Sequence, residues 1–287
     1  MSRLTIPKTY KLYIGGKFPR SESGRVYEVA TRGGDFLANA AKASRKDARD
    51  AVVAARSAVS GWAGTSGYNR GQVLYRIAEL LEGRSAQFVA EIMRVEGASE
   101  SAAVAQVDKA IDRWVWYAGW SDKYAQVTGS SNPVAGPYFN LSVPEPTGVV
   151  AIVAPQGEGS LLGFVGAVAP ALVAGNTVIV LASERYPLSA ISLSEVLATS
   201  DVPGGVVNIL TGSPAEITPW LASHADVNAL DLVGAGALEW VDLQIAAAET
   251  LKRVLPPEEG PDAAAPSLDR IAAFTETKTV WHTKGLL

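Results

Sequence analysis

The amino-terminal part of the chain carries apolar side chains at three- and four-residue spacing, the period of a helix with one buried face. Ser44 and Asp47 form a capping pair ahead of the first such run, and Gly61 lies just past its predicted end. Two further runs of the same kind cover residues 73–88 and 104–115. We therefore expect a layer of helices in this part of the chain.

Two short alternating segments precede these helices. Residues 12–14 lie just before Gly15 and Gly16, and residues 26–29 follow them. Apolar alternation bounded by glycine is typical of strands joined by a short connection. The pattern predicts that the two segments pair as a β-hairpin.

From residue 148 onward, continuous apolar segments alternate with segments long enough for helices. The strand candidates are residues 148–154, 177–181, 206–210, 228–233 and 251–255. The helix candidates are residues 161–174, 188–199, 215–223 and 237–249. This alternation predicts an α/β fold, a doubly wound parallel sheet with helices on both faces. Ligands of such sheets bind outside the carboxyl ends of the strands.

Two segments do not belong to that pattern. Residues 126–146 are punctuated by glycine and proline, and residues 274–282 form a late strand candidate after a segment rich in proline and acid. We expect these two segments to pair with each other outside the main core.

The apolar stretch of residues 161–182 is long enough to raise the question of a membrane span. It contains Pro170, Gly175 and Asn176, which interrupt a helix. We expect a buried helix, a turn and a strand here, and no interaction with a membrane.

The composition of the 287-residue chain excludes several kinds of site. It contains no cysteine, and therefore no disulfide, thiolate metal site or cysteine nucleophile. A net charge of −4 provides no cationic field for nucleic acid, so the expected partners are proteins or small molecules. The two histidines, His224 and His282, lie in different predicted zones, so we expect no metal site. Residues 1–10 lack the apolar core of a signal peptide, which predicts a cytoplasmic location.

Short motifs follow one another along nearly the whole chain. They are LYIGGK at residues 12–17, EPTGVVAIVAP at 145–155, APALVAGNTVIV at 169–180, VPGGVVNILTG at 202–212 and LKRV at 251–254. In order and number these motifs resemble the aldehyde dehydrogenase superfamily. Residues 117–150 look closest to the degenerate carboxyl-terminal half of aldehyde dehydrogenase family 16.

The resemblance implies a Rossmann-like dinucleotide-binding domain with a β oligomerisation arm, from which the catalytic domain is missing. In the family that domain follows LKRV, whereas here LKRV is soon followed by a segment similar to the closing arm strand. The expected division is residues 1–125 for the hairpin and helices, 126–145 for the first arm segment, 146–255 for the Rossmann-like core, 256–267 for a linker replacing the catalytic domain and 268–287 for the carboxyl-terminal arm strand.

Aldehyde oxidation in this family needs a cysteine nucleophile, an asparagine that holds the oxyanion and a glutamate base. The chain has no cysteine, and the family's Pro-Trp-Asn run reads Pro155-Gln156-Gly157. In the family's Leu-Glu-Leu-Gly-Gly run, Pro257 takes the place of the base, and Glu258 lies one residue further along. The resemblance therefore implies no catalytic residue and no independent aldehyde dehydrogenase activity.

The same comparison gives candidate residues for NAD or NADP. In relatives a lysine and a glutamate after the second strand hold the adenosine ribose, and here those positions are Leu181 and Glu184. Gly212 is retained, although Pro214 replaces a second glycine.

The Gly-Ser-Thr run that opens a helix beneath the pyrophosphate is here Gly234-Ala235-Gly236, and Glu239 replaces the next glycine. The candidate cofactor-binding residues are therefore Glu184, Gly212 and Gly234. Together they form a dinucleotide site that is either retained or vestigial.

These features favour a non-catalytic structural or regulatory subunit, a pseudoenzyme of an oxidoreductase family. Its arm would pair with a second copy or with an active, full-length aldehyde dehydrogenase. Two alternatives stay open: a module that binds NAD, NADP or another nucleotide, and one part of an active NAD-dependent complex completed by a partner.

Overall fold

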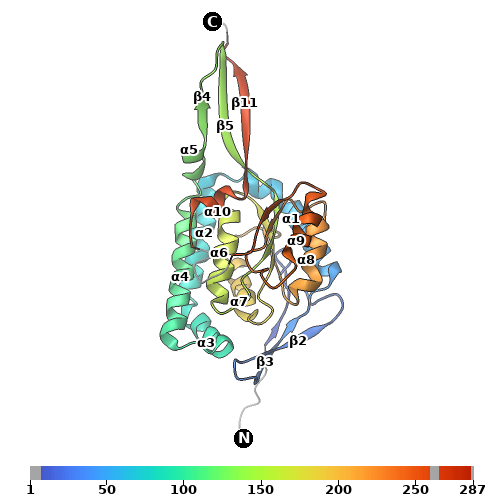
Figure 1. Ribbon diagram of the computed structural model, residues 1–287. Coiled ribbons are helices and arrows are strands. Elements are labelled where there is room, and N and C mark those ends of the chain that lie inside the picture. The colour runs from blue at the N-terminus through green and yellow to red at the C-terminus, as the bar shows by residue number, and fades with distance from the viewer. Residues whose placement is uncertain (1–7, 259–264, 286–287) are drawn as a thin grey trace.

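A five-stranded parallel sheet forms the centre of the molecule in the computed structural model, which describes residues 8–258 and 265–285 (Figure 1). Its strands follow the order β10-β9-β6-β7-β8. Their bounds are β6 (Val149–Val153), β7 (Thr177–Leu181), β8 (Val207–Leu210), β9 (Ala229–Asp231) and β10 (Arg253–Leu255). The structure thus confirms the predicted parallel sheet, and all five predicted strand positions contain a strand.

Helices cover both faces of this sheet, which confirms the doubly wound α/β fold. On one face lie α2 (Gly67–Glu82), α3 (Ser85–Glu96), α4 (Glu100–Ala118), α6 (Ser160–Val173) and α7 (Leu188–Leu197). On the other lie α1 (Arg45–Gly64), α8 (Pro214–Ser223) and α9 (Trp240–Ala248) (Figure 1). Successive strand residues alternate between the faces: Val150 and Ile152 join one apolar cluster, and Val149 and Val153 join the other.

The predicted hairpin between residues 12–14 and 26–29 is wrong. Strand β2 (Val26–Ala30) instead pairs with β3 (Phe36–Ala41), and β1 (Thr9–Tyr10) runs parallel to β3. Tyr13 forms a bridge with Ile209 at the edge of the central sheet, with N–O distances of 3.0 and 2.7 Å. Burial of Leu12 and Tyr13 against the body decides this pairing, because both side chains are almost fully shielded from solvent.

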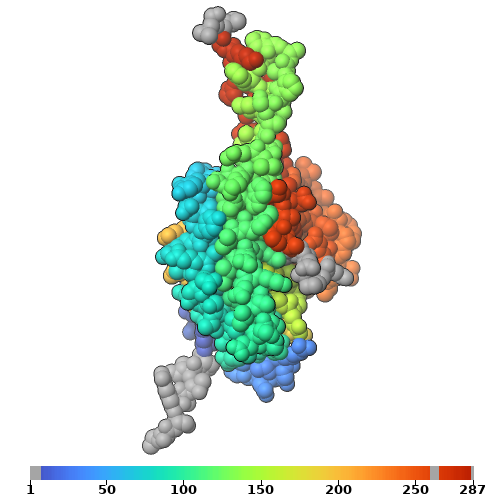
Figure 2. Space-filling view, turned by 90° about the vertical axis from the view of Figure 1, so that its left-hand side faces the viewer, coloured from blue at the N-terminus to red at the C-terminus, as the bar shows by residue number. Residues whose placement is uncertain are grey.

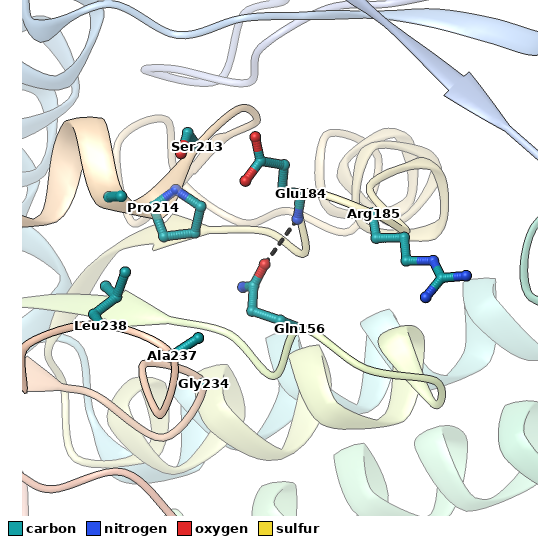
Figure 3. Close-up of a pocket in the computed structure, with 9 residues that line it drawn as sticks. Gln156, Glu184, Arg185, Ser213, Pro214, Gly234, Ala237 and Leu238 are labelled. Atoms are coloured by element: carbon teal, nitrogen blue, oxygen red, sulfur yellow. Dashed lines mark hydrogen bonds between the residues drawn. The ribbon is translucent and has the colours of Figure 1, made fainter.

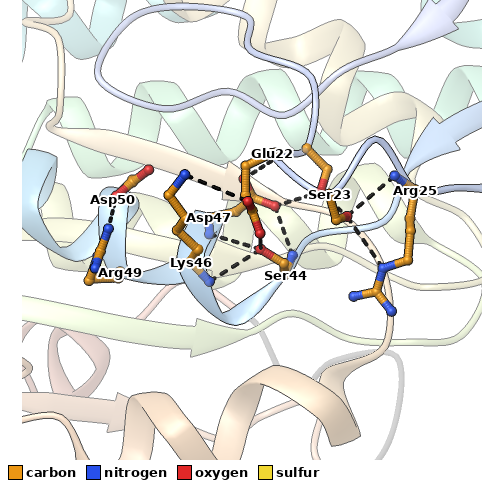
Figure 4. A network of polar contacts seen from close by, with 9 residues as sticks. Glu22, Ser23, Arg25, Ser44, Lys46, Asp47, Arg49 and Asp50 are labelled. Atoms are coloured by element: carbon orange, nitrogen blue, oxygen red, sulfur yellow. Dashed lines mark hydrogen bonds and ion pairs between the residues drawn. The ribbon is translucent and has the colours of Figure 1, made fainter.

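The start of α1 is fixed by a polar network that joins it to the preceding loops (Figure 4). The Ser44 hydroxyl accepts from the Asp47 backbone N–H at 3.2 Å, and the Asp47 carboxylate accepts from the Ser44 N–H at 2.8 Å. This is the predicted capping box. Asp47 also accepts hydrogen bonds from the Ser21 hydroxyl and the Glu22 N–H, so the same carboxylate anchors the loop before β2.

Several helix boundaries differ from the prediction. Helix α1 continues past Gly61 to Gly64, and the single run over residues 73–88 is divided between α2 and α3 by a turn at Gly83 and Arg84. Helix α9 begins at Trp240 rather than at residue 237, because residues 234–239 form successive turns.

The predicted membrane-length stretch consists of α6, a turn and β7, as expected. Pro170 lies inside α6, and the helix ends only before Gly175 and Asn176. Within the described residues, no helix is both long and apolar enough to span a bilayer.

A three-stranded antiparallel sheet projects from the body (Figures 1 and 2). It comprises β4 (Ser130–Asn132), β5 (Tyr138–Pro146) and β11 (Thr275–Thr283), and α5 (Tyr124–Thr128) leads into it. The β5–β11 register runs from Thr275 opposite Pro146 to Thr283 opposite Tyr138. This confirms the expected pairing of the two distant segments, and we call this sheet the arm.

Helix α10 (Leu268–Ala272) precedes the arm strand β11 and packs on the body. The expectation that residues 268–287 form an arm strand is therefore wrong for residues 268–274, because Ile271 and Phe274 are buried in the main core. Residues 259–264 of the expected linker, and residues 1–7 and 286–287, lie outside the described part of the chain.

Candidate functional site

A cavity of about 420 Å³ opens at the carboxyl ends of the central strands (Figure 3). It lies between the segments that follow β6, β7, β8 and β9, where an α/β sheet normally receives its ligand. Its lining residues are Gln156, Glu184, Arg185, Ser213, Pro214, Ala215, Gly234, Ala237 and Leu238. Two of the three predicted site residues, Glu184 and Gly234, therefore line one cavity.

Gln156 holds two of these segments together beneath the cavity. Its side-chain oxygen accepts from the Glu184 N–H at 2.9 Å, and its amide nitrogen donates to the Ala154 carbonyl at 2.6 Å. The Gln156 carbonyl also accepts from the Ser183 hydroxyl at 3.0 Å. Because these groups are bonded within the protein, Gln156 serves mainly to position Glu184.

Glu184 and Ser213 provide polar groups on the same side of the cavity (Figure 3). Glu184 is exposed, and the Ser213 side chain forms no capping hydrogen bond to α8. A carboxylate beside a hydroxyl is a suitable pair for the hydroxyl groups of a sugar. Burial, with a contribution from the negative charge of Glu184, raises the pKa of the nearby Tyr27, so the Tyr27 hydroxyl stays protonated at neutral pH.

Gly234 is required by the backbone around it. A β-carbon at this position would lie 1.9 Å from the Ala154 carbonyl oxygen. The Gly234 N–H already donates to the Val153 carbonyl at 2.9 Å. Gly234 therefore allows the β9 segment to approach β6, and its amide is not available to a phosphate.

Gly212 is the one predicted site residue that does not line the cavity. Its φ of +120° belongs to a region that favours glycine, and a β-carbon would lie 3.3 Å from the Ala43 nitrogen. The neighbouring Thr211 hydroxyl donates to the Ala41 carbonyl at 2.5 Å. Gly212 thus serves the packing of β3 against the end of β8.

The helix starts near the cavity offer little to an anion. Pro214 is the first residue of α8 and has no N–H, while Glu239 lies at the start of α9. At the start of α6 the Glu96 carboxylate accepts from the N–H groups of Gly159 and Ser160 at 2.9 and 3.0 Å. This buried carboxylate occupies the position where a helix amino terminus would otherwise attract phosphate.

A second cavity of about 380 Å³ lies beside the first, between α8 and α9. Both are lined by Ala215 and Leu238, and the second adds Pro219, Glu239, Asp242, Leu243 and Ala246. Its walls are apolar apart from the two carboxylates. Sequence reasoning identified neither this cavity nor the contributions of Gln156, Ser213 and Leu238, because neutral residues in these positions have no distinctive spacing.

Gly157, Pro257 and Glu258, which the sequence analysis compared with catalytic positions, lie in the segments that follow β6 and β10. Gly157 follows Gln156 in a bend, and Pro257 lies after β10. Glu258 is exposed, and its N–H donates to the Val233 carbonyl at 3.4 Å. Among residues 8–258 and 265–285, no group of three or more potential ligands is arranged to hold a metal ion.

Comparisons with known proteins agree with this architecture. The model of the aldehyde dehydrogenase family matches residues 18–262. Human retinal dehydrogenase 2 is 32% identical over 253 residues, which cover 86% of this chain and 48% of that protein. Mouse cytosolic 10-formyltetrahydrofolate dehydrogenase is 31% identical over 246 residues, 82% of this chain and 26% of that protein.

Solved structures give the same result. The NAD-dependent aldehyde dehydrogenase of Sinorhizobium meliloti superposes with a TM-score of 0.79 at 27% identity, covering 87% of this chain and 50% of that one. The aldehyde dehydrogenase of Bacillus cereus, solved as its NAD+ complex, gives 0.79 at 26% identity and covers 86% and 50%. The chain therefore spans about half the length of these relatives.

Proposed function

The chain belongs to the aldehyde dehydrogenase family, and on that premise we propose that it is a non-catalytic structural or regulatory subunit. Its arm would assemble with a second copy or with an active aldehyde dehydrogenase. The observation that carries the proposal is an arm with exposed apolar side chains on a chain that has no cysteine.

The absence of a nucleophile supports the non-catalytic half of this proposal. Thiolate attack on the aldehyde carbonyl is the step that creates the intermediate from which hydride leaves, so the chain alone has no means of starting the reaction. Gly157 and Pro257 supply neither an oxyanion donor side chain nor a base. We interpret residues 256–267 as a linker in place of the catalytic domain. We also infer that the chain resembles the carboxyl-terminal half of aldehyde dehydrogenase family 16.

One side of the arm presents apolar side chains of β5 to solvent, beside the ion pair of Lys278 and Glu145 on the same side. Alternate residues of β5, namely Phe139, Leu141 and Val143, point to one side of the sheet, and their exposed fractions are 54%, 41% and 41%. Val280 lies opposite Leu141 on the same side. Burial of these apolar side chains against another surface would lower the free energy of the sheet.

The opposite side of the arm combines an internally bonded polar ladder with the exposed rings of Tyr138 and Trp281, whose centres lie 5.8 Å apart. Asn132 donates to the side-chain oxygens of Asn140 and Ser142 at 2.6 and 2.8 Å, and the Ser142 and Thr279 hydroxyls lie 2.9 Å apart. This ladder keeps the three strands in register.

The base of the arm is held firmly by the body. Asn176 is fully buried, accepts from the Gly148 N–H at 2.7 Å and donates to the Phe274 carbonyl at 2.9 Å. The Thr147 N–H also donates to the Phe274 carbonyl at 3.1 Å. These contacts fix where β5 and β11 leave the core, which reduces the entropy lost on docking.

Affinity purification from the native host at endogenous expression tests this proposal. We expect the chain to be recovered in an assembly of fixed stoichiometry, either with itself or with an aldehyde dehydrogenase that has the catalytic cysteine. The purified chain alone should give no aldehyde-dependent NAD reduction. Turnover that persists through stringent purification would exclude the non-catalytic interpretation.

The cavities favour a second candidate function, a module that binds NAD, NADP or another nucleotide. Glu184 lines a cavity at the expected edge of the sheet, which supports this alternative. Calorimetric titration with NAD and NADP tests it, and absence of heat at millimolar ligand would exclude it for these two ligands. A complex made catalytic by its partner is distinguished by activity that appears only on mixing.

A further inference from the structure

Two glutamates of α3 line one small cavity but differ in their hydrogen bonding. Glu91 and Glu96 border this cavity together with Ile92, Val95, Ser160 and Ser189. It leaves no room for a water molecule, so the polar groups around it depend on protein partners. From the contrast between the two carboxyl groups we propose that Glu91 is a proton-operated latch. Its protonated form keeps α3 docked, and its ionised form loosens both α3 and the start of α6.

Glu96 is well satisfied as a hydrogen-bond acceptor. Its Oε1 accepts from the N–H and the hydroxyl of Ser160, at 3.0 and 2.6 Å. Its Oε2 accepts from the Gly159 N–H at 2.9 Å and from the Gln106 side-chain amide of α4 at 3.1 Å. Glu96 therefore ties α3 to the start of α6, and its donors suit a charged carboxylate.

Glu91 lacks this support. Its Oε2 accepts from the Ser192 hydroxyl of α7 at 2.7 Å, while its Oε1 is shielded from solvent and has no hydrogen-bond partner within the described part of the chain. A buried oxygen without a partner is costly on an ionised carboxylate and less so on a neutral carboxyl group. Of the two glutamates, Glu91 is therefore the one that holds a proton.

The serines of the cavity offer an acceptor for that proton. The Ser160 hydroxyl donates to Glu96, so Ser189 is the donor at the 2.9 Å contact between the Ser160 and Ser189 hydroxyls. The Ser189 oxygen keeps lone pairs and borders the same cavity as Glu91. A protonated Glu91 can therefore complete a chain of hydrogen bonds from α3 through α7 to α6. Ionisation of Glu91 removes the donor from this chain.

The charges that face Glu91 from other elements oppose one another. Lys8, just before β1, and Arg94 on α3 favour the ionised form, whereas Glu195 on α7 disfavours it. Lys8 is itself paired with Glu195 at 2.6 Å. Tyr10 of β1 stays neutral, because burial raises its pKa to about 12. The contacts from α4 and α6 described above come from uncharged amides and hydroxyls, so burial is the main cause of the raised pKa of Glu91.

The position of Glu91 in α3 makes its proton matter to the start of α6. Helix α3 begins at Ser85 without a side-chain cap, so the contacts of Glu91 and Glu96 are important in holding it. Loosening of α3 withdraws the Glu96 carboxylate from the N–H groups of Gly159 and Ser160. The latch thereby links pH to the order of the segment between β6 and α6.

Hydrogen exchange of the intact chain, measured by mass spectrometry from about pH 5 to 8 and corrected for the intrinsic exchange rate, tests the proposal. Opening of residues 85–96 and of residues 157–162 should increase together as pH rises. The increase should reach about tenfold per pH unit at most while the carboxyl group ionises. Residues 177–181 of β7 are buried and should stay protected over the whole range.

Glu91→Gln identifies the titrating group. Its amide has the shape of the protonated carboxyl group and no charge, so the variant should keep residues 85–96 protected and lose the pH dependence. Glu82→Gln removes an exposed carboxylate of α2 and should keep the pH dependence of the wild type. Ser192→Ala removes the donor to the ionised form, so its opening at the upper end of the range should exceed that of the wild type.

Four results would overturn the proposal. They are α3 protection that does not change with pH, wild-type pH dependence in Glu91→Gln, opening of α3 that leaves residues 157–162 unchanged, and equal opening of β7, which would indicate global unfolding. Helix α3 lies at the end of the body opposite the arm (Figure 1). Assembly through the arm is therefore a separate matter, and the two proposals can fail independently.

Discussion

Arg270 in α10 donates a hydrogen bond to the Asp231 carboxylate at the end of β9, with 2.5 Å between Nη2 and Oδ2. Both side chains are buried, and the second Asp231 oxygen accepts from the Val233 N–H at 3.1 Å. The pair joins the helix at the base of the arm to a central strand and to the segment that leads into the cavity. Asp231 raises the pKa of Arg270 against the opposing effect of burial, so the guanidinium stays charged.

Removal of one member of this pair should destabilise the protein strongly. Asp231→Ala leaves Arg270 buried without its counterion, and we expect a loss of about 3–5 kcal/mol in the free energy of unfolding. Lys278→Gln breaks an exposed arm pair with Glu145 and should cost no more than about 1 kcal/mol. Urea denaturation of both variants measures these costs, and equal losses would contradict the structural role of Asp231.

Glu91 in α3 should make stability depend on pH. Its Oε2 accepts from the Ser192 hydroxyl at 2.7 Å, while Oε1 is shielded from solvent without a hydrogen-bond partner among the described residues. Burial raises the pKa of the Glu91 carboxyl, and Glu195 adds to the increase while Lys8 and Arg94 oppose it. Burial, with a contribution from Glu91, also raises the pKa of Tyr10 to about 12.

The sign of the effect follows from proton linkage. Because the folded state holds the Glu91 proton more tightly than the unfolded state, the favourable contribution is complete below the ordinary carboxyl pKa and is lost as pH rises through the raised value. The stability of Glu91→Gln relative to the wild type should therefore increase as the pH rises from acidic to neutral. Denaturation midpoints of the wild type and the variant across this range measure the difference in stability. A difference that stays constant with pH would refute the prediction. Glu82→Gln, at an exposed carboxylate, is the control and should show such a constant difference.

Gly234 and Gly236 offer a matched comparison in the segment that borders the cavity. Gly234→Ala places a methyl group against the Ala154 carbonyl and should destabilise the fold by about 1–3 kcal/mol. A β-carbon at Gly236 meets no atom within 4 Å, so Gly236→Ala should change stability by no more than about 1 kcal/mol. Thermal denaturation distinguishes them, and an unaffected Gly234→Ala variant would show that the close approach to β6 is dispensable.

The sequence predicts the central sheet well because its strands are buried on both faces. Residues 177–181 form a continuous apolar segment, and β7 occupies those residues. The pattern does not specify partners in the same way, since the contact of Tyr13 with Ile209 depends on a strand far away in the chain. Asp231 is equally unpredictable, because its counterion lies in α10, beyond the expected linker.

The candidate site was predictable only in part. Glu184 and Gly234 followed from resemblance and line the cavity, whereas the role of Gly212 in packing depends on its contact with residues 42 and 43. Gln156 and Ser213 have no spacing that distinguishes them from other polar residues. The carboxylate of Glu96 at the start of α6 belongs to a different helix, so its effect on anion binding requires the tertiary structure.

The arm tests the central claim most directly. Three forms of the chain are purified from the host, and sedimentation measures the native mass of each. We predict that the wild type sediments in an assembly larger than its own 30.0 kDa. Phe139→Lys with Leu141→Lys should reduce it to the single chain, because two charges would be buried at the interface. Val53→Lys, on an exposed part of α1, is the control and should keep the assembly. A wild type that sediments as a single chain, or an arm variant that keeps the wild-type mass, would contradict the account.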